Sequence, residues 1–227
     1  MDKTQTFLLV APVLLFSMVA HEYAHGYAAL RQGDPTAYQL GRLTWNPLKH
    51  IDPFMTIILP ILTFITAGVM FGGAKPVPVN PRNYRNFKRG DIIVSLAGVA
   101  TNLVLAVLAV LAVALVGLAG RGIPALAASA SILQLMLVYG ILINLVLAFF
   151  NMIPIPPLDG SHVAKYLLPP AWALRYEQFG RYGLIVLMLL ITIGTGFMRA
   201  FFMPIFYLHS AAVRLLLPFI LPSPWTT

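Results

Sequence analysis

The sequence predicts an all-α polytopic membrane protein, and three observations lead to this prediction. Hydrophobic residues make up 59% of the 227 positions and charged residues only 10%, proportions far from those of soluble domains. Several apolar runs reach the roughly 20 residues that a helix needs to cross a lipid bilayer. Short polar connections separate these runs. We therefore expect one transmembrane domain over residues 1–227, with about five full transmembrane helices embedded in a lipid bilayer.

The apolar runs divide into a core and an accessory part. We expect the core at residues 7–30, 92–119 and 132–160, and accessory helices over residues 184–221, as runs 184–197 and 201–221 with a break between them. The remaining run, residues 51–71, contains Pro60 and ends beside several glycines. Such residues interrupt a helix, so this run is expected to be re-entrant, entering the membrane and returning to the same side.

The first apolar run ends on the pattern His21-Glu22-Tyr23-Ala24-His25. Two imidazoles four residues apart lie on the same face of a helix, which is the spacing for two ligands of one Zn²⁺. Glu22 between them is placed to act on water held by that ion. A lone histidine in an apolar helix is usually a hydrogen-bonded core residue. The pair with its carboxylate, in so hydrophobic a run, favours a metal site instead.

A third ligand is needed, and the carboxylates suggest one. The chain has seven Asp and Glu residues and no Cys, and five of the seven carboxylates fall in connections or at run ends. The exceptions are Glu22 and Asp159. Asp159 closes the sequence NMIPIPPLDG, whose prolines force an extended path out of the fourth apolar run. A catalytic zinc keeps three protein ligands and one open position, so we predict His21, His25 and Asp159 around one Zn²⁺ per chain.

This ligand set constrains the topology. If all six runs crossed the membrane, the first and fourth would run in opposite directions, and His25 and Asp159 would lie at opposite surfaces. A re-entrant second run makes them parallel. The distribution of basic residues supports the same topology, because it puts eleven Lys and Arg residues in cytoplasmic connections and three outside. The metal site should then lie within the cell membrane, nearer the cytoplasmic face.

The net charge of +8 raises the question of a nucleic-acid partner. The basic residues alternate with membrane-length apolar runs, which is typical of loops beside anionic lipid. We therefore expect no nucleic acid as a partner.

Two motifs together resemble the site-2 protease family of intramembrane zinc metalloproteases. They are HEYAHG in the first run and NMIPIPPLDG after the fourth, in this order. The segments LGRLTWNPLKHIDP and AKPVPVNPRNYRN resemble connections of a bacterial branch that lacks PDZ and CBS domains. The resemblance implies that His21, His25 and Asp159 are zinc ligands and that Glu22 is the catalytic carboxylate. Asn151 matches an asparagine thought to contact the substrate or the oxyanion.

Some positions depart from the family pattern or allow two interpretations. The family commonly has Gly-Pro-x-x-Asn, where this chain has Gly98-Val99-Ala100-Thr101-Asn102. Asn102 is a second oxyanion candidate, although it could equally form an interhelical hydrogen bond. Asn151 could simply cap its helix. His162 stands where relatives often have Arg. It could replace a ligand or form a hydrogen bond to one, and we favour the hydrogen bond or simple exposure to solvent over the ligand role.

The predicted activity is hydrolysis of a peptide bond within or next to a transmembrane segment of another membrane protein. Zinc-activated water would attack the carbonyl, with Glu22 as general base. A helical substrate must unwind first, most simply by adding to an exposed strand edge. We expect such a short strand at the membrane surface at residues 36–45, with Tyr38, Leu40 and Leu43.

Two other functions fit parts of the pattern. A metal transporter or sensor also buries His and Asp, but it typically places them along a path, whereas here they cluster at one end. A catalytically silent homologue that binds membrane proteins is the other alternative, and an intact Glu22 argues against it.

Overall fold

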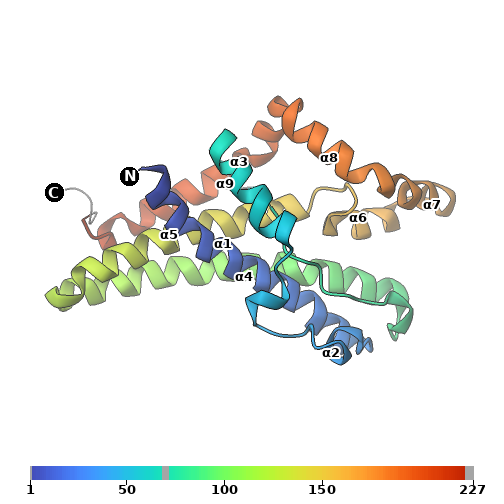
Figure 1. Cartoon of the computed structure of the whole chain (residues 1–227), viewed down its shortest axis with the longest axis horizontal. Coiled ribbons are helices and arrows are strands. Elements are labelled where there is room, and N and C mark those ends of the chain that lie inside the picture. Colours follow the sequence, from blue (N-terminus) through green and yellow to red (C-terminus); the bar gives the residue numbers. More distant parts are fainter. Residues whose placement is uncertain (1, 68–71, 223–227) are drawn as a thin grey trace.

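The computed structural model describes residues 2–67 and 72–222, and within these ranges the chain is helical with no strand (Figure 1). Among the described residues, four helices are long and apolar enough to cross a membrane, which confirms a polytopic all-α membrane protein. The helices are α1 (Lys3–Gln32), α2 (Thr36–Gln39), α3 (Leu59–Ala67), α4 (Phe87–Gly122), α5 (Ala127–Asn151), α6 (Asp159–Ala164), α7 (Pro170–Phe179), α8 (Gly183–Thr192) and α9 (Thr195–Leu216).

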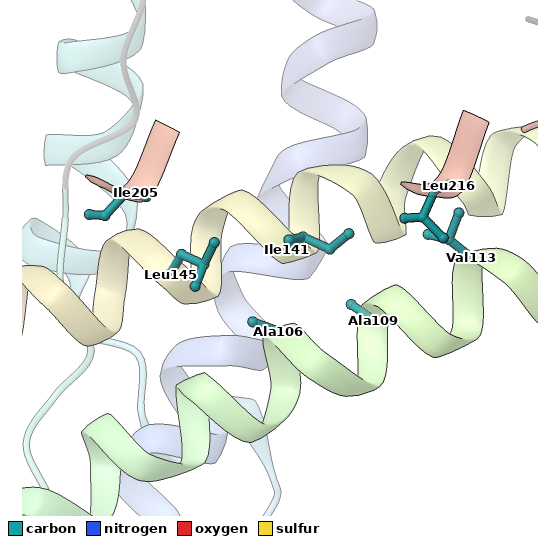
Figure 2. Close-up of a cluster of buried hydrophobic side chains, with 7 residues drawn as sticks. All are labelled: Ala106, Ala109, Val113, Ile141, Leu145, Ile205 and Leu216. Carbon is teal, nitrogen blue, oxygen red and sulfur yellow. The ribbon is translucent and has the colours of Figure 1, made fainter. Parts of the chain in front are cut away.

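Helices α4 and α5 form an antiparallel hairpin that α9 covers on one side. Figure 2 shows small α4 residues facing larger α5 residues, with two side chains of α9 closing the cluster. Its members are Ala106, Ala109, Val113, Ile141, Leu145, Ile205 and Leu216. Lipid is as apolar as these side chains, so helices associate in a membrane through close packing, and small residues permit that approach. The α4–α5 hairpin is thus the fixed framework on which the site is built.

Helix α1 crosses this hairpin and buries a continuous stretch from Ser17 to His21 against it. The Asp2 side chain accepts from the Gln5 amide in a capping box at the start of α1, and Gly33, at φ 110°, ends the helix. Helices α1 and α5 run in the same direction, both from left to right in Figure 1. Their carboxyl-terminal ends therefore lie on the same side, as the metal site requires.

The two ends of the second apolar run lie side by side, and its re-entry into the membrane stays a prediction. A π-helical turn (Pro53–Ile58) leads into α3, and residues 72–80 follow without regular secondary structure. Gly73 N–H donates to the Met55 carbonyl at 2.9 Å, and Lys75 N–H donates to the His50 carbonyl at 2.8 Å. The returning chain is therefore hydrogen-bonded to the point where it left. Residues 68–71, the end of the predicted range, lie outside the described residues.

The accessory part differs from its prediction. The run at residues 184–197 was expected to cross the membrane, but α8 has only 10 residues, which gives about 15 Å of helix. The break lies at Ile193 and Gly194. We predicted it at residues 198–200, but α9 is continuous there. Glycine is a poor helix former, whereas Met198, Arg199 and Ala200 are good ones, so the break follows Gly194. Among the described residues, four helices are long and apolar enough to cross a membrane, where about five were expected.

The strand predicted at residues 36–45 is not formed. Instead, α2 occupies Thr36–Gln39, and a turn follows with Gly41 at φ 62°. Asp34 explains this outcome, since its carboxylate accepts from both the backbone N–H and the hydroxyl of Thr36. Such local side-chain bonds favour a turn or helix start over a sheet edge.

Asp34 also ties this turn to the segment before α4. It is fully buried, and it accepts from Asn80 N–H at 2.6 Å and from Asn83 Nδ2 at 2.8 Å. Burial alone would raise the pKa of Asp34, but the hydrogen bonds from Asn80, Thr36 and Asn83 outweigh burial and lower it. The stabilisation is therefore present above the unfolded-state pKa of about 3.9 and is lost as the pH falls through the lower folded-state value.

We expect Asp34→Asn to lower the free energy of unfolding by about 2 kcal/mol at pH 7, because an amide presents N–H groups to backbone donors. Thermal unfolding in detergent micelles between pH 7 and pH 3 measures this effect. The wild-type protein should lose stability toward pH 3 by more than the variant does. Asp2→Asn, at the exposed start of α1, is the control. An Asp34→Asn melting temperature equal to that of wild type would contradict the assigned role.

Candidate metal centre

Three predicted ligands meet at one point. His21 and His25 lie one turn apart in α1, with ring centroids 4.6 Å apart. Asp159 Oδ2 lies 3.1 Å from Nε2 of His21 and 3.3 Å from Nε2 of His25. One ligand atom of each residue lies within 4.8 Å of the others. Two atoms bound to a tetrahedral zinc at 2.0–2.1 Å are about 3.3 Å apart, so the two distances from Asp159 to the histidine nitrogens fit that ion.

Both imidazoles present the nitrogen that a metal needs. His21 Nδ1–H donates to Asn102 Oδ1 at 2.5 Å, and His25 Nδ1–H donates to the Val94 carbonyl at 2.7 Å. A carbonyl oxygen only accepts, so each Nδ1 carries the proton and each neutral ring keeps its Nε2 lone pair free. Both free nitrogens are the ones beside Asp159. Fixing the tautomer through the opposite nitrogen is how metal-binding histidines are usually oriented.

Gly98 makes room for the site. It lies in α4 opposite the two histidines, and a Cβ there would lie 2.5 Å from two atoms of the His21 ring and 2.6 Å from His25 Nε2. Any other residue would enter the space between the ligands. The donor set, the tautomers and this space all fit a bound Zn²⁺.

Asp159 is positioned by the chain that leaves α5. After Asn151 the chain turns through buried Ile153, and Asp159 is the first residue of α6. A Cβ on Gly160 would overlap the Met152 carbonyl, so the start of α6 packs directly on the end of α5. This contact brings the carboxylate back to α1.

A buried carboxylate of α4 holds α6 from the other side. Asp91 accepts from Lys165 Nζ at 2.8 Å and from Tyr166 Oη at 2.9 Å, and His162 Nδ1 lies 3.3 Å from it. Asp91 is 3% exposed. Because the segment bearing Asp159 also bears these three partners, Asp91 anchors the third ligand to the hairpin framework.

We expect Asp91→Asn to lower the free energy of unfolding by about 3 kcal/mol, because it leaves the Lys165 ammonium without its buried partner. Zinc affinity should fall as well, since α6 is released. Thermal unfolding and zinc titration of the purified protein measure both effects. Glu177→Gln is the matched control: it removes the half-exposed partner of Lys165, 3.1 Å away, and should cost less than about 1 kcal/mol. Equal losses in the two variants would contradict the anchoring role.

Glu22 is held by the returning chain after α3. Val77 N–H donates to Glu22 Oε2 at 2.7 Å. Val77 is itself buried, and its Cγ1 would lie 2.9 Å from a Cβ placed on Gly26, one turn beyond Glu22. The carboxylate thus has a fixed orientation next to the ligands that flank it in the sequence.

Comparison with known protein families identifies the family to which this chain belongs. The profile described as "Peptidase family M50" matches residues 9–193, a range that contains the three predicted ligands and Glu22. The chain belongs to peptidase family M50, the site-2 protease family.

M50 relatives match most of the chain. "Putative zinc metalloprotease YwhC" of Bacillus subtilis is 38% identical over 190 residues, which is 84% of this chain and 82% of that protein. "Putative zinc metalloprotease Rip2" of Mycolicibacterium smegmatis is 35% identical, covering 82% of this chain and 68% of the relative. Rip2 of Mycobacterium tuberculosis strain H37Rv is 27% identical, covering 81% and 66%. No solved structure matches. The family and these names indicate a membrane zinc metalloprotease.

The other three candidate residues of this M50 chain each have a different hydrogen-bond partner. Asn102 is fully buried and contacts the His21 ring. Asn151 donates to the Leu147 carbonyl at 2.9 Å, one turn back in α5. His162 pairs with Asp91. A role in binding the substrate or the oxyanion therefore stays a prediction for Asn102 and Asn151.

Sequence reasoning missed several residues that build the site. Ser17 and Asn144 are polar residues in the middle of apolar runs, which is the signal that could have identified them. Asp91 was taken for a solvated charge because it lies at the start of a run. Val77 contributes only a backbone N–H, for which side-chain patterns carry no signal.

Proposed function

We propose that this M50 protein is an intramembrane zinc endopeptidase that hydrolyses a peptide bond within or next to a transmembrane segment of another membrane protein. One observation carries the proposal: Nε2 of His21 and Nε2 of His25, on a helix long enough to span a bilayer, converge with an Asp159 oxygen at the start of α6. Glu22 lies between the two histidines in the same helix. The family and the names of the relatives support zinc and proteolysis.

The residues have separate tasks. His21, His25 and Asp159 would hold one Zn²⁺, which when bound lowers the pKa of water and polarises the scissile carbonyl. Glu22 accepts the proton of the attacking water and passes it to the leaving amine. The Val77 N–H keeps the Glu22 carboxylate oriented for both transfers. Asn151 is the first candidate to donate to the developing oxyanion, because Asn102 Nδ2 already donates to Asn144 Oδ1 and to the Ser17 carbonyl.

We propose that the site lies in the cell membrane, nearer the cytoplasmic face. The outer side of α4 carries a row of apolar residues that are 40–66% exposed, as expected where lipid contacts a helix: Leu103, Val104, Val107, Leu111 and Leu115. The exposed Lys88 and Arg89 lie in the first turn of α4, on the side of Gly98 away from the exposed apolar row, and supply positive charge there. Positive charge flanking a membrane helix favours the cytoplasmic side.

The test compares cells that express the full wild-type chain with cells that express Asp159→Ala. Mass spectrometry of new peptide amino-termini in membrane fractions should find cleavage in or beside transmembrane segments in the wild type alone. A substrate found in this way is then reconstituted with the purified protein in liposomes. Cleavage should stop on addition of a zinc chelator and resume when zinc is restored. Identical termini in both strains, or cleavage that is indifferent to chelation, would overturn the proposal.

A further inference from the structure

A chain of buried polar groups leads from α5 to the metal centre. Asn144 in α5 accepts at its Oδ1 from Asn102 Nδ2 at 2.8 Å, and Asn102 Oδ1 accepts from His21 Nδ1. Ser17 of α1 contributes its hydroxyl, which accepts from Asn144 Nδ2 at 2.9 Å. The exposed fractions of Ser17, Asn102 and Asn144 are 0%, 0% and 4%. Helices α1, α4 and α5 therefore meet in a polar cluster that contacts the predicted zinc ligand His21.

Backbone carbonyls fix the direction of every bond in this cluster. Asn144 Nδ2 also donates to the Gly140 carbonyl at 2.9 Å, one turn back in α5. With both N–H groups of Asn144 used, its Oδ1 must face Asn102. Asn102 Nδ2 donates to this oxygen and, at 3.4 Å, to the Ser17 carbonyl. The orientation of the Asn102 amide is thus set from two sides, and its oxygen is the atom left facing His21.

We propose that Asn144, assisted by Ser17, is a positioning residue of the metal centre that sets the tautomer of His21 through Asn102. This inference rests on the proposed zinc site. If Asn102 turned over, its N–H₂ group would face His21 Nδ1, which would then have to accept. The ring proton would move to Nε2, the nitrogen beside Asp159, and that nitrogen would lose its free lone pair. Asn144 prevents this turn without touching a ligand.

A purely adhesive role for the same hydrogen bonds is the competing explanation, because polar groups also hold membrane helices together. α5 offers a matched comparison. Gln134 is 2% exposed, donates to the Val113 and Phe219 carbonyls at 2.8 and 3.0 Å, and accepts from Leu221 N–H at 2.9 Å. It joins α5 to α4 and to the turn after α9, and has no bond to the zinc ligands. Adhesion predicts equal effects at Gln134 and Asn144.

The experiment measures zinc affinity of the full-length protein in detergent by competition with a chromogenic chelator. Asn144→Leu should weaken zinc binding about tenfold, the lower range for loss of a partner that orients a ligand. Ser17→Ala should have a smaller effect, because the Gly140 carbonyl still holds Asn144. Gln134→Leu should lower the melting temperature and leave zinc affinity unchanged. Wild-type affinity in Asn144→Leu, or an equal loss in Gln134→Leu, would overturn the inference.

Two further readouts separate positioning from a general loss of structure. In zinc-free protein labelled with ¹⁵N-histidine, the His21 proton should lie on Nδ1 in the wild type and move partly to Nε2 in Asn144→Leu. The His21 signal is identified by its loss in His21→Asn. In an Asn102→Leu background, Asn144→Leu should cause no further loss of zinc affinity, because its effect passes through Asn102. Additive losses, or an unchanged tautomer, would contradict the inference.

These readouts also distinguish the two proposals. If the wild type binds zinc but cleaves nothing, the proposed function fails while the zinc series still decides the role of Asn144. If the wild type binds no zinc, the proposed function and the role of Asn144 in a metal centre both fail, and the tautomer measurement decides only whether Asn144 orients the His21 ring.

Discussion

Replacing Glu22 by Gln is expected to reduce cleavage by about 10²–10⁴-fold, the usual contribution of a general base, while zinc stays bound. The Gln side chain has nearly the same shape, and its carbonyl oxygen can still accept from the Val77 N–H, which lies 2.7 Å from the wild-type oxygen. It cannot take up a proton from water. None of the three predicted ligands is altered, so metal content should equal that of wild type.

The measurement is cleavage of a reconstituted membrane substrate together with elemental analysis of zinc. The chain supplies its own control, because Glu177 is the only other glutamate in the sequence. Glu177 is half exposed and pairs with Lys165. Glu177→Gln should cleave at close to the wild-type rate. Full activity in Glu22→Gln would exclude Glu22 as the base, whereas loss of zinc from this variant would show that it is part of the metal site.

Adding a single methyl group at Gly98 should also have a large effect, this time on the metal. In Gly98→Ala the new Cβ would lie 2.5 Å from the His21 ring, closer than any non-bonded carbon contact allows, so the two imidazoles must separate. We expect zinc affinity to fall at least about 100-fold, at the upper end for changes next to metal ligands, and cleavage to fall with it.

Gly122→Ala controls for the general effect of such a change in α4, since a Cβ there meets nothing within 4 Å. Alanine favours helix over glycine, so both variants should fold, and circular dichroism can verify this. Zinc titration should separate them clearly. Normal zinc binding in Gly98→Ala would mean that the histidines do not hold the ion as their geometry indicates.

The sequence predicted those features that depend only on residues close together in the chain. Two histidines four residues apart share a helix face whatever surrounds them, and a carboxylate after three prolines has few structural explanations. The requirement that His25 and Asp159 meet then predicted the re-entrant turn at α3, since only parallel helices could bring them within 3.3 Å. These steps need no tertiary detail.

Predictions were wrong where two local tendencies compete or where partners come from distant segments. Residues 184–197 are apolar enough to cross a membrane, but Gly194 divides them, and hydropathy does not register that break. The strand at residues 36–45 was predicted because a substrate needs an edge to pair with, yet Asp34 binds Thr36 locally and favours a helical turn. The direction of the Asn102 amide depends on Asn144 and Ser17, from two other helices, and a linear pattern does not show it.

The bond between Val77 and Glu22 has one more consequence. Val77 stands between Pro76 and Pro78, neither of which has an amide hydrogen, so the peptide group of Val77 is the sole main-chain donor across those three positions. Because that donor belongs to the backbone, exchange of the valine side chain leaves it in place, and only proline at position 77 deletes it. The hydrogen-bond partner of Glu22 is thereby insulated from nearly every substitution at position 77, and evolution can exchange that side chain without removing the donor that holds the proposed base.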